Sequence, residues 1–206
     1  DLYIAKISSQ SGGSVFSYKT KEHLSADSNY VNLISEENKN NLLLDFRDLS
    51  GDDIVLVDGW VQQEALDSLY LLEEVLTITF SNNFWGNKIT KTLTFYPESY
   101  LIDVDVDLTA ISENILANSY SLGWGGGLPT TEKDTTDEAT YFGAFLYQGG
   151  ELLDVKVGSG ENFDNNYKGE TDWVATRSKY FVVSLLDGIG GQILGSNISA
   201  TFDNKE

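Results

Sequence analysis

Apolar and polar side chains alternate at every second position along most of this chain, and clusters of Gly, Asn, Asp or Ser interrupt the alternation. The segments Val75–Ser81 and Lys88–Tyr96, separated by NNFWGN, form the clearest example. A period of two places successive side chains on opposite faces of a β-strand, and polar clusters between such segments indicate turns. The sequence therefore predicts an all-β, mainly antiparallel fold with at most one or two short helices.

Two segments depart from this alternation. Gln62–Leu76 carries leucines near helical spacing, and the pattern leaves helix and strand both open. Leu128–Thr140 is polar and contains one of the two prolines of the chain, so we expect an exposed loop there. Strand-like segments lie on both sides of that loop, and no internal repeat occurs at a period of about 20 to 50 residues. We therefore expect a single domain over residues 1–206.

The charge and the residue types exclude several classes of function. Thirteen Lys and Arg residues against 32 Asp and Glu residues give a formal net charge of −19. This charge repels nucleic-acid phosphates and anionic lipid head groups, so we expect no nucleic-acid partner. The chain has no cysteine and one histidine, His23, which excludes thiolate metal sites and sites that need two imidazoles. We expect no cofactor and no metal.

Three aspartates form the strongest candidate for a metal site. Asp103, Asp105 and Asp107 are separated by single valines, so a strand places all three carboxylates on one face. A calcium-binding EF-hand loop also needs a Gly at its sixth position and a Glu at its twelfth, and this segment has neither. We favour a solvated strand face over a calcium site.

No combination of residues predicts an enzyme. With 32 acidic residues, some pair of carboxylates meets the spacing for glycoside hydrolysis by chance alone. A Ser-His-Asp system would have to use His23, in a stretch that reads as exposed, and no G-x-S-x-G motif occurs. The glycine-rich stretches Gly123–Gly127 and Gly188–Gly191 do not match a phosphate-binding loop, and we expect turns or bulges there.

A more specific pattern lies in Thr171–Leu186. Its distinctive residues are Trp173, Val174, Ala175, Lys179, Tyr180 and Phe181. This pattern resembles the signature of the large periplasmic domain of YidC-type membrane protein insertases. Three further stretches resemble the same family in the same order: Leu2–His23, Gly86–Leu108 and Gly123–Tyr147. The resemblance therefore covers nearly the whole chain, and the ordered combination is more specific than any one stretch.

The resemblance implies a β-supersandwich related in fold to galactose mutarotase. It implies that residues 1–206 form one periplasmic domain of a longer, multi-pass protein of the bacterial inner membrane. Its role would be non-catalytic, as part of an insertase and chaperone for inner-membrane proteins. The implied partners are the Sec translocase with its periplasmic accessory subunits, and nascent inner-membrane proteins. Mutarotase chemistry uses paired histidines, which this chain lacks, so we expect no enzymatic activity.

Two questions stay open at this point. We expect the signature residues to anchor the end of the domain onto the sandwich, and a docking patch is the alternative. The alternative for the whole chain is an extracellular carbohydrate-binding or sugar-modifying β-sandwich. That alternative needs tryptophans exposed together as a stacking platform, although burial in a core is the commoner fate of this side chain. The candidates are Trp60, Trp85, Trp124 and Trp173.

Overall fold

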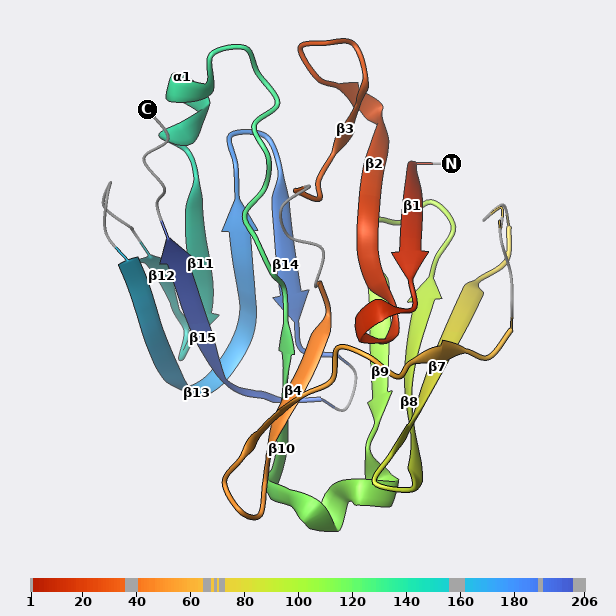
Figure 1. Ribbon diagram of the computed structural model, residues 1–206. Coiled ribbons are helices and arrows are strands. Elements are labelled where there is room, and N and C mark those ends of the chain that lie inside the picture. The colour runs from red at the N-terminus through yellow and green to blue at the C-terminus, as the bar shows by residue number, and fades with distance from the viewer. Residues whose placement is uncertain are drawn as a thin grey trace. The chain divides into compact units, whose positions relative to one another are not determined.

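Antiparallel β-strands make up most of the protein (Figure 1). The computed structural model describes residues 2–35, 41–64, 68, 70, 73–155, 162–188 and 191–201. Contacts within the chain define two compact units, Asp1–Gly126 (unit 1) and Gly127–Glu206 (unit 2). Every strand pairing among the described residues is antiparallel. The prediction of an all-β antiparallel fold is confirmed, since helical structure is limited to short segments.

Unit 1 contains three sheets, with strand orders β1-β2-β3, β10-β4-β5 and β6-β7-β8-β9. Two short 3-10 helices, η1 and η2, connect strands of this unit. The elements are β1 (Tyr3–Ser8), η1 (Gln10–Gly12), β2 (Ser14–Leu24), β3 (Tyr30–Asn32), β4 (Leu43–Asp48), β5 (Asp53–Val55), β6 (Val61–Gln62), β7 (Leu76–Phe84), β8 (Asn87–Phe95), β9 (Ile102–Asp107), η2 (Thr109–Asn114) and β10 (Ile115–Gly123).

The β7–β8 hairpin is the segment that the alternation predicted most clearly. Its strands pair continuously from Leu76 opposite Phe95 to Phe84 opposite Asn87. The turn therefore consists of two residues, Trp85 and Gly86, and the strands extend further into NNFWGN than predicted. Both turn residues have positive φ, 50° and 77°, as a two-residue type I′ turn requires.

A tight turn at two glycines packs directly against the core of unit 1. Gly12 and Gly13 have φ of +67° and +102°. A Cβ on Gly12 would lie 2.7 Å from the ring of Trp60, and one on Gly13 would lie 2.7 Å from Phe80. Both rings are buried, together with the inward-facing residues of β8. Only glycine allows the backbone to come this close to the aromatic core.

A lysine also lies in this core. Lys91 of β8 is fully buried between Ile89 and Leu93, which face inward with it. Its Nζ donates to the carbonyl of Ser11, 2.7 Å away, and to the carbonyl of Leu42. Burial lowers the pKa of Lys91 to about 7. One side chain therefore ties the η1 turn and the start of β4 to the central strand of a third sheet.

Unit 2 is built on one long strand. Its elements are α1 (Thr135–Ala139), β11 (Gly143–Gln148), β12 (Glu151–Val155), β13 (Asn162–Arg177), β14 (Val182–Leu186) and β15 (Ile193–Thr201). The first part of β13 pairs with β15, and its last part pairs with β11 and β14. Figure 1 shows β15 alongside β13. Leu146, Val155 and Ile198 form the buried centre, against which Phe163 and Val174 pack.

Three expectations from the sequence have different outcomes when they are compared with this fold. The exposed loop expected at Leu128–Thr140 is wrong in part, because residues 135–139 form α1 and Glu138 is buried. Much of Gln62–Leu76 lies outside the described residues; within it, Gln62 ends β6 and Leu76 begins β7. The single domain over residues 1–206 stays a prediction.

Candidate functional site

The strand half of the family signature lies in the C-terminal part of β13. Trp173 is half-buried and stacks on Tyr147 of β11, with ring centroids 6.0 Å apart and an interplanar angle of 10°. Val174 lies on the opposite face, where it packs against the core around Leu146. Ala175 is buried. These three adjacent residues thus contribute to both faces of the sheet.

The second half of the signature forms the turn between β13 and β14. Ser178 closes this turn, because its N–H donates to the Phe181 carbonyl at 2.9 Å and its Oγ accepts from the Phe181 N–H at 3.2 Å. Lys179 and Tyr180 lie between these two residues. A turn closed at both ends fixes the backbone from which these two side chains extend.

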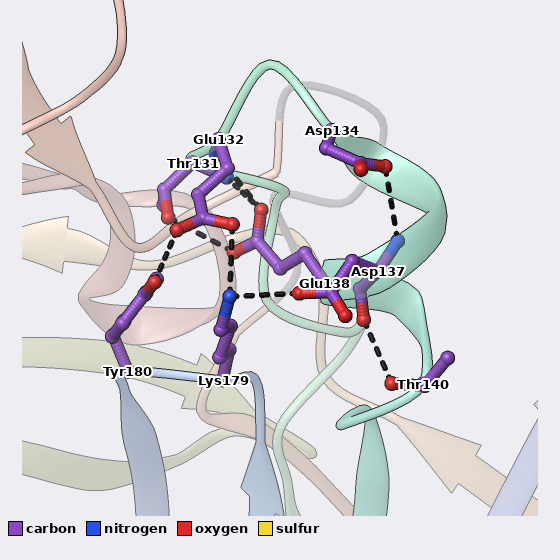
Figure 2. A network of polar contacts seen from close by, with 8 residues as sticks. All are labelled: Thr131, Glu132, Asp134, Asp137, Glu138, Thr140, Lys179 and Tyr180. Carbon is purple, nitrogen blue, oxygen red and sulfur yellow. Dashed lines mark hydrogen bonds and ion pairs between the residues drawn. The ribbon is translucent and has the colours of Figure 1, made fainter.

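Lys179 and Tyr180 point toward the segment that precedes β11 (Figure 2). Lys179 Nζ lies 3.1 Å from Glu132 Oε2 and 2.8 Å from Asp137 Oδ2. The Tyr180 hydroxyl donates to the other oxygen of Glu132. The ammonium also lies 5.6 Å from the ring centroid of Tyr141 and 5.2 Å from that of Tyr180. One lysine thus bridges the β13–β14 turn and residues 132–141.

A buried carboxylate, that of Glu138, also binds the segment that carries Glu132 and Asp137. Glu138 of α1 accepts from the Thr131 N–H at 2.7 Å, the Thr131 hydroxyl at 2.9 Å and the Glu132 N–H at 2.9 Å. Asp134 caps α1 by accepting from the Asp137 N–H at 3.1 Å. Figure 2 shows these contacts as one connected group, so hydrogen bonds within residues 131–138 help to position the backbone that carries Glu132 and Asp137, the two partners of Lys179.

The electrostatics of this network favour one protonation state. Hydrogen bonds to Asp137, Tyr180 and Glu132 raise the pKa of Lys179. The hydrogen bond from Tyr180, and then that from Lys179, lower the pKa of Glu132. Donation to Glu132 raises the pKa of the Tyr180 hydroxyl. A charged lysine, a charged glutamate and a neutral tyrosine are therefore all stabilised together.

The acidic partners in this network were not predicted from the sequence. Glu132 and Lys179 are 47 residues apart, and no local pattern connects them. The cap of α1 did leave a local signal, because Asp134 precedes a short run that ends in Asp137 and Glu138. What the network does chemically is hold two segments together, because the Lys179 ammonium is paired with Glu132 and Asp137, and the Glu138 carboxylate is satisfied by hydrogen bonds.

A separate acidic face lies in unit 1. Asp103, Asp105 and Asp107 of β9 are all exposed on one face of the sheet, as the alternation predicts. Their cross-strand neighbours on β8 are threonines at positions 94, 92 and 90, and threonines and a serine continue this face onto β7. No basic side chain occupies a directly cross-strand position beside these carboxylates.

The three aspartates differ in what they contact. Asp103 accepts from the Tyr96 hydroxyl, and Asp107 accepts from the Thr109 N–H at 2.9 Å. Hydrogen bonding to Thr109 lowers the pKa of Asp107. Asp105 makes no hydrogen bond or ion pair within the described part of the chain. Among the residues that the structure describes, no group of three or more acidic, His or Cys side chains is placed to hold a metal ion.

A groove adjoins β9 on the face opposite the aspartates, because Val106, which alternates with them, lines it. It has a volume of about 290 Å³ and lies between β9, η2 and β10. Val106, Leu108 and Ile115 give it an apolar lining, and polar side chains of η2 and β10 complete it. Tyr120 lies at the groove, where burial, and then the charge of Asp105, raise the pKa of its hydroxyl. The groove and the acidic face therefore share β9.

The remaining candidates from the sequence do not come together. Trp60 is buried and donates from Nε1 to the Leu56 carbonyl at 3.0 Å, so the four tryptophans do not form one exposed platform. His23 is exposed at the end of β2. The stretch Gly188–Gly191 lies partly outside the described residues.

Comparison with known proteins decides the family. The family model for the YidC periplasmic domain matches residues 1–194. The chain belongs to the YidC periplasmic domain family. It is 33% identical over 192 residues to the membrane protein insertase YidC of Chlorobaculum parvum, covering 90% of this chain and 32% of that protein. The corresponding protein of Chlorobium luteolum is 32% identical over 190 residues, with 90% and 32% covered.

The match concerns one part of these YidC relatives. The chain spans about a third of the length of the curated relatives it matches. No solved structure matches it. Among the described residues, no helix is both long and apolar enough to span a membrane. The resemblance to a YidC periplasmic domain, recognised from the signature around Trp173 and Lys179, is thereby confirmed.

Proposed function

We propose that this YidC periplasmic domain is a non-catalytic binding module of a membrane protein insertase and chaperone in the bacterial inner membrane. The observation that carries the proposal is the family match over residues 1–194, with relatives named as membrane protein insertases. In this proposal the domain supports insertion and folding by holding partner proteins close to the membrane. Its partners are the Sec translocase, through periplasmic accessory subunits, and nascent inner-membrane proteins.

Charge supports a partner with a basic surface. Unit 1 carries seven basic and 19 acidic residues, a net charge of −12, and its acidic face has no directly cross-strand basic neighbour. A surface of one sign attracts a partner of the other sign and accelerates its association. The same charge disfavours contact with anionic lipid head groups.

For the signature residues we propose a structural role. Lys179 and Tyr180 are engaged with Glu132 and Asp137 inside unit 2, and Trp173 is engaged with Tyr147. Side chains already paired within a unit must break those contacts before they bind a partner. These contacts favour anchoring over docking, because the turn at Lys179 fastens β13 and β14 to the segment before β11.

Calorimetric titration of this domain with the periplasmic part of the Sec accessory complex from the same organism tests the proposal. We expect saturable binding that weakens about tenfold or more between about 50 and 300 mM salt, because screening shortens the range of exposed charges. Absence of heat at both salt concentrations, with both proteins folded and concentrated, would remove direct docking by this domain. An affinity that does not change with salt concentration would assign the contact to an apolar surface instead.

A further inference from the structure

Two strands of unit 1 that follow each other in the chain, β9 and β10, each lie at the edge of a different sheet. Within the described residues, β9 pairs only with β8, and β10 pairs only with β4. The short helix η2 joins these two terminal strands (Figure 1, the bright green coil at the bottom). The groove of about 290 Å³ lies between them. A terminal strand leaves every second N–H and C=O without a sheet partner, and those groups form a template for another strand.

The side chains of β9 define what such a strand must carry. On one face its residues are Asp103, Asp105 and Asp107, all exposed. On the other face they are aliphatic and half-buried, and Val106 lines the groove. A residue directly opposite on an added strand has its Cβ about 5 Å from that of its neighbour on the same face. The matching strand therefore alternates basic residues with aliphatic ones.

We propose that the free edge of β9 binds an extended segment of a partner protein, with Lys or Arg at every second position and β-branched aliphatic residues between them. This inference rests on the proposed binding function and specifies the recognition mode, in which main-chain hydrogen bonds give affinity and alternate side chains give specificity. The basic residues lie opposite the three aspartates. The aliphatic residues lie beside Val106 and reach the apolar lining of the groove.

Charge selects this occupant over a second copy of the chain. A copy brings a further net charge of −19, and its β9 would set aspartates against aspartates. Charged side chains also protect exposed strand edges against self-association. If the aspartates only protected the edge against self-association, two copies of β9 would repel each other and nothing more would follow. The proposal requires in addition that a cationic strand binds to this edge and that its backbone forms hydrogen bonds with β9.

The test uses a fluorescent peptide of about eight residues that alternates lysine and valine, a length typical of a β-strand. Fluorescence anisotropy measures its binding to the 206-residue chain at low salt. Two further peptides have identical side chains but carry N-methyl groups on the amides of either the lysines or the valines. We expect at least one methylated peptide to bind about tenfold or more weakly, since one set of amides must face the edge of β9.

Matched variants of the protein separate the edge from the net charge. The edge variant is Asp103→Asn, Asp105→Asn and Asp107→Asn together. The control variant removes three exposed carboxylates of unit 2, by Glu151→Gln, Glu170→Gln and Asp172→Asn. Both variants have the same net charge. We expect about a tenfold loss of peptide affinity in the edge variant and less than about a threefold loss in the control, as for a few partly exposed ion pairs.

The melting temperature supplies a second readout. Three like charges on one strand face repel each other, so Asp105→Asn leaves the melting temperature unchanged or raises it while peptide binding falls. Three outcomes overturn the proposal: no binding of the unmethylated peptide, equal binding of all three peptides, or equal losses in the edge and control variants. If the peptide fails but the Sec accessory complex still binds, only the recognition mode falls and the proposed function stands. If both fail, the proposed function falls as well.

Discussion

The amine of Lys91 shows how one buried group can make folding depend on pH. Its two acceptors are the carbonyls of Ser11 and Leu42, and no carboxylate among the described residues bonds to it. A neutral amine has two N–H groups, which match the two carbonyls. The ammonium form has a third N–H and a charge, both of which would be buried at a cost. The folded protein therefore holds this lysine in its neutral form more readily than the unfolded chain does.

The free energy of unfolding should rise with pH above neutrality. The pKa of Lys91 is about 7 in the folded state, against about 10.4 in an unfolded chain. The unfolded state therefore binds more protons between these values, and stability falls as pH drops from the upper value to the lower one. Urea unfolding at about pH 7, 8 and 9 should give a slope of up to about 1.4 kcal/mol per pH unit. Lys91→Met removes the titrating group, and an equal slope in that variant would contradict this assignment.

Truncation of Trp173 should have a moderate effect on stability. The side chain is half-buried and stacks on Tyr147, so Trp173→Ala is expected to cost about 1 to 3 kcal/mol, less than loss of a fully buried tryptophan. A double-mutant cycle with Tyr147→Ala, measured by urea unfolding, should give a coupling of about 0.5 to 1.5 kcal/mol. Unchanged stability together with lost partner binding would instead make Trp173 a docking residue.

Among the elements, those made by local interactions could be predicted and those made by distant contacts could not. The β7–β8 hairpin follows from alternation and a turn within one segment, and the strand face of Asp103 follows from the same period. The alternation also places Lys91 beside Ile89 and Leu93, although its carbonyl acceptors come from other segments. Burial of Glu138 depends on the fold of residues 131 to 138, where the polar composition indicated solvent exposure. The network at Lys179 joins segments that no sequence period relates.

The segment around α1 should depend on Glu138 more than on any ion pair. Its carboxylate accepts three hydrogen bonds while fully buried, so Glu138→Ala leaves the Thr131 donors and the Glu132 N–H without a partner. We expect a loss of about 2 to 4 kcal/mol in the free energy of unfolding. Lys179→Ala breaks only partly exposed ion pairs and should cost about 1 kcal/mol or less. Chemical denaturation of both variants checks this order, and a larger loss for Lys179→Ala would reverse it.

Across the whole molecule, negative charge opposes compaction. Unit 1 has a net charge of −12, and unit 2, with six basic and 13 acidic residues, has −7. Both units therefore carry self-repulsion, which salt screens over about 10 Å at 0.1 M.

Thermal stability should accordingly increase with ionic strength. Between about 20 and 300 mM sodium chloride we expect the melting temperature to rise by a few degrees. Salt in this range weakens the repulsion between like charges on the surface of each unit. Differential scanning calorimetry measures it. A separate variant, Lys133→Glu, changes an exposed position of unit 2. It adds negative charge and should make the melting temperature depend more steeply on salt. A melting temperature that falls with salt would mean that the existing ion pairs outweigh the repulsion.

The length of β13 has a mechanical consequence. Its sixteen residues pair first with β15 and then, beyond a register shift between Lys168 and Thr171, with β11 and β14. Backbone hydrogen bonds in an antiparallel sheet lie across the strands, so tension directed along β13 loads many of them in parallel, in shear. A hairpin pulled apart from its open end loses its bonds one at a time. Unit 2 is therefore built to resist stretching along this strand and to yield by peeling at its edges.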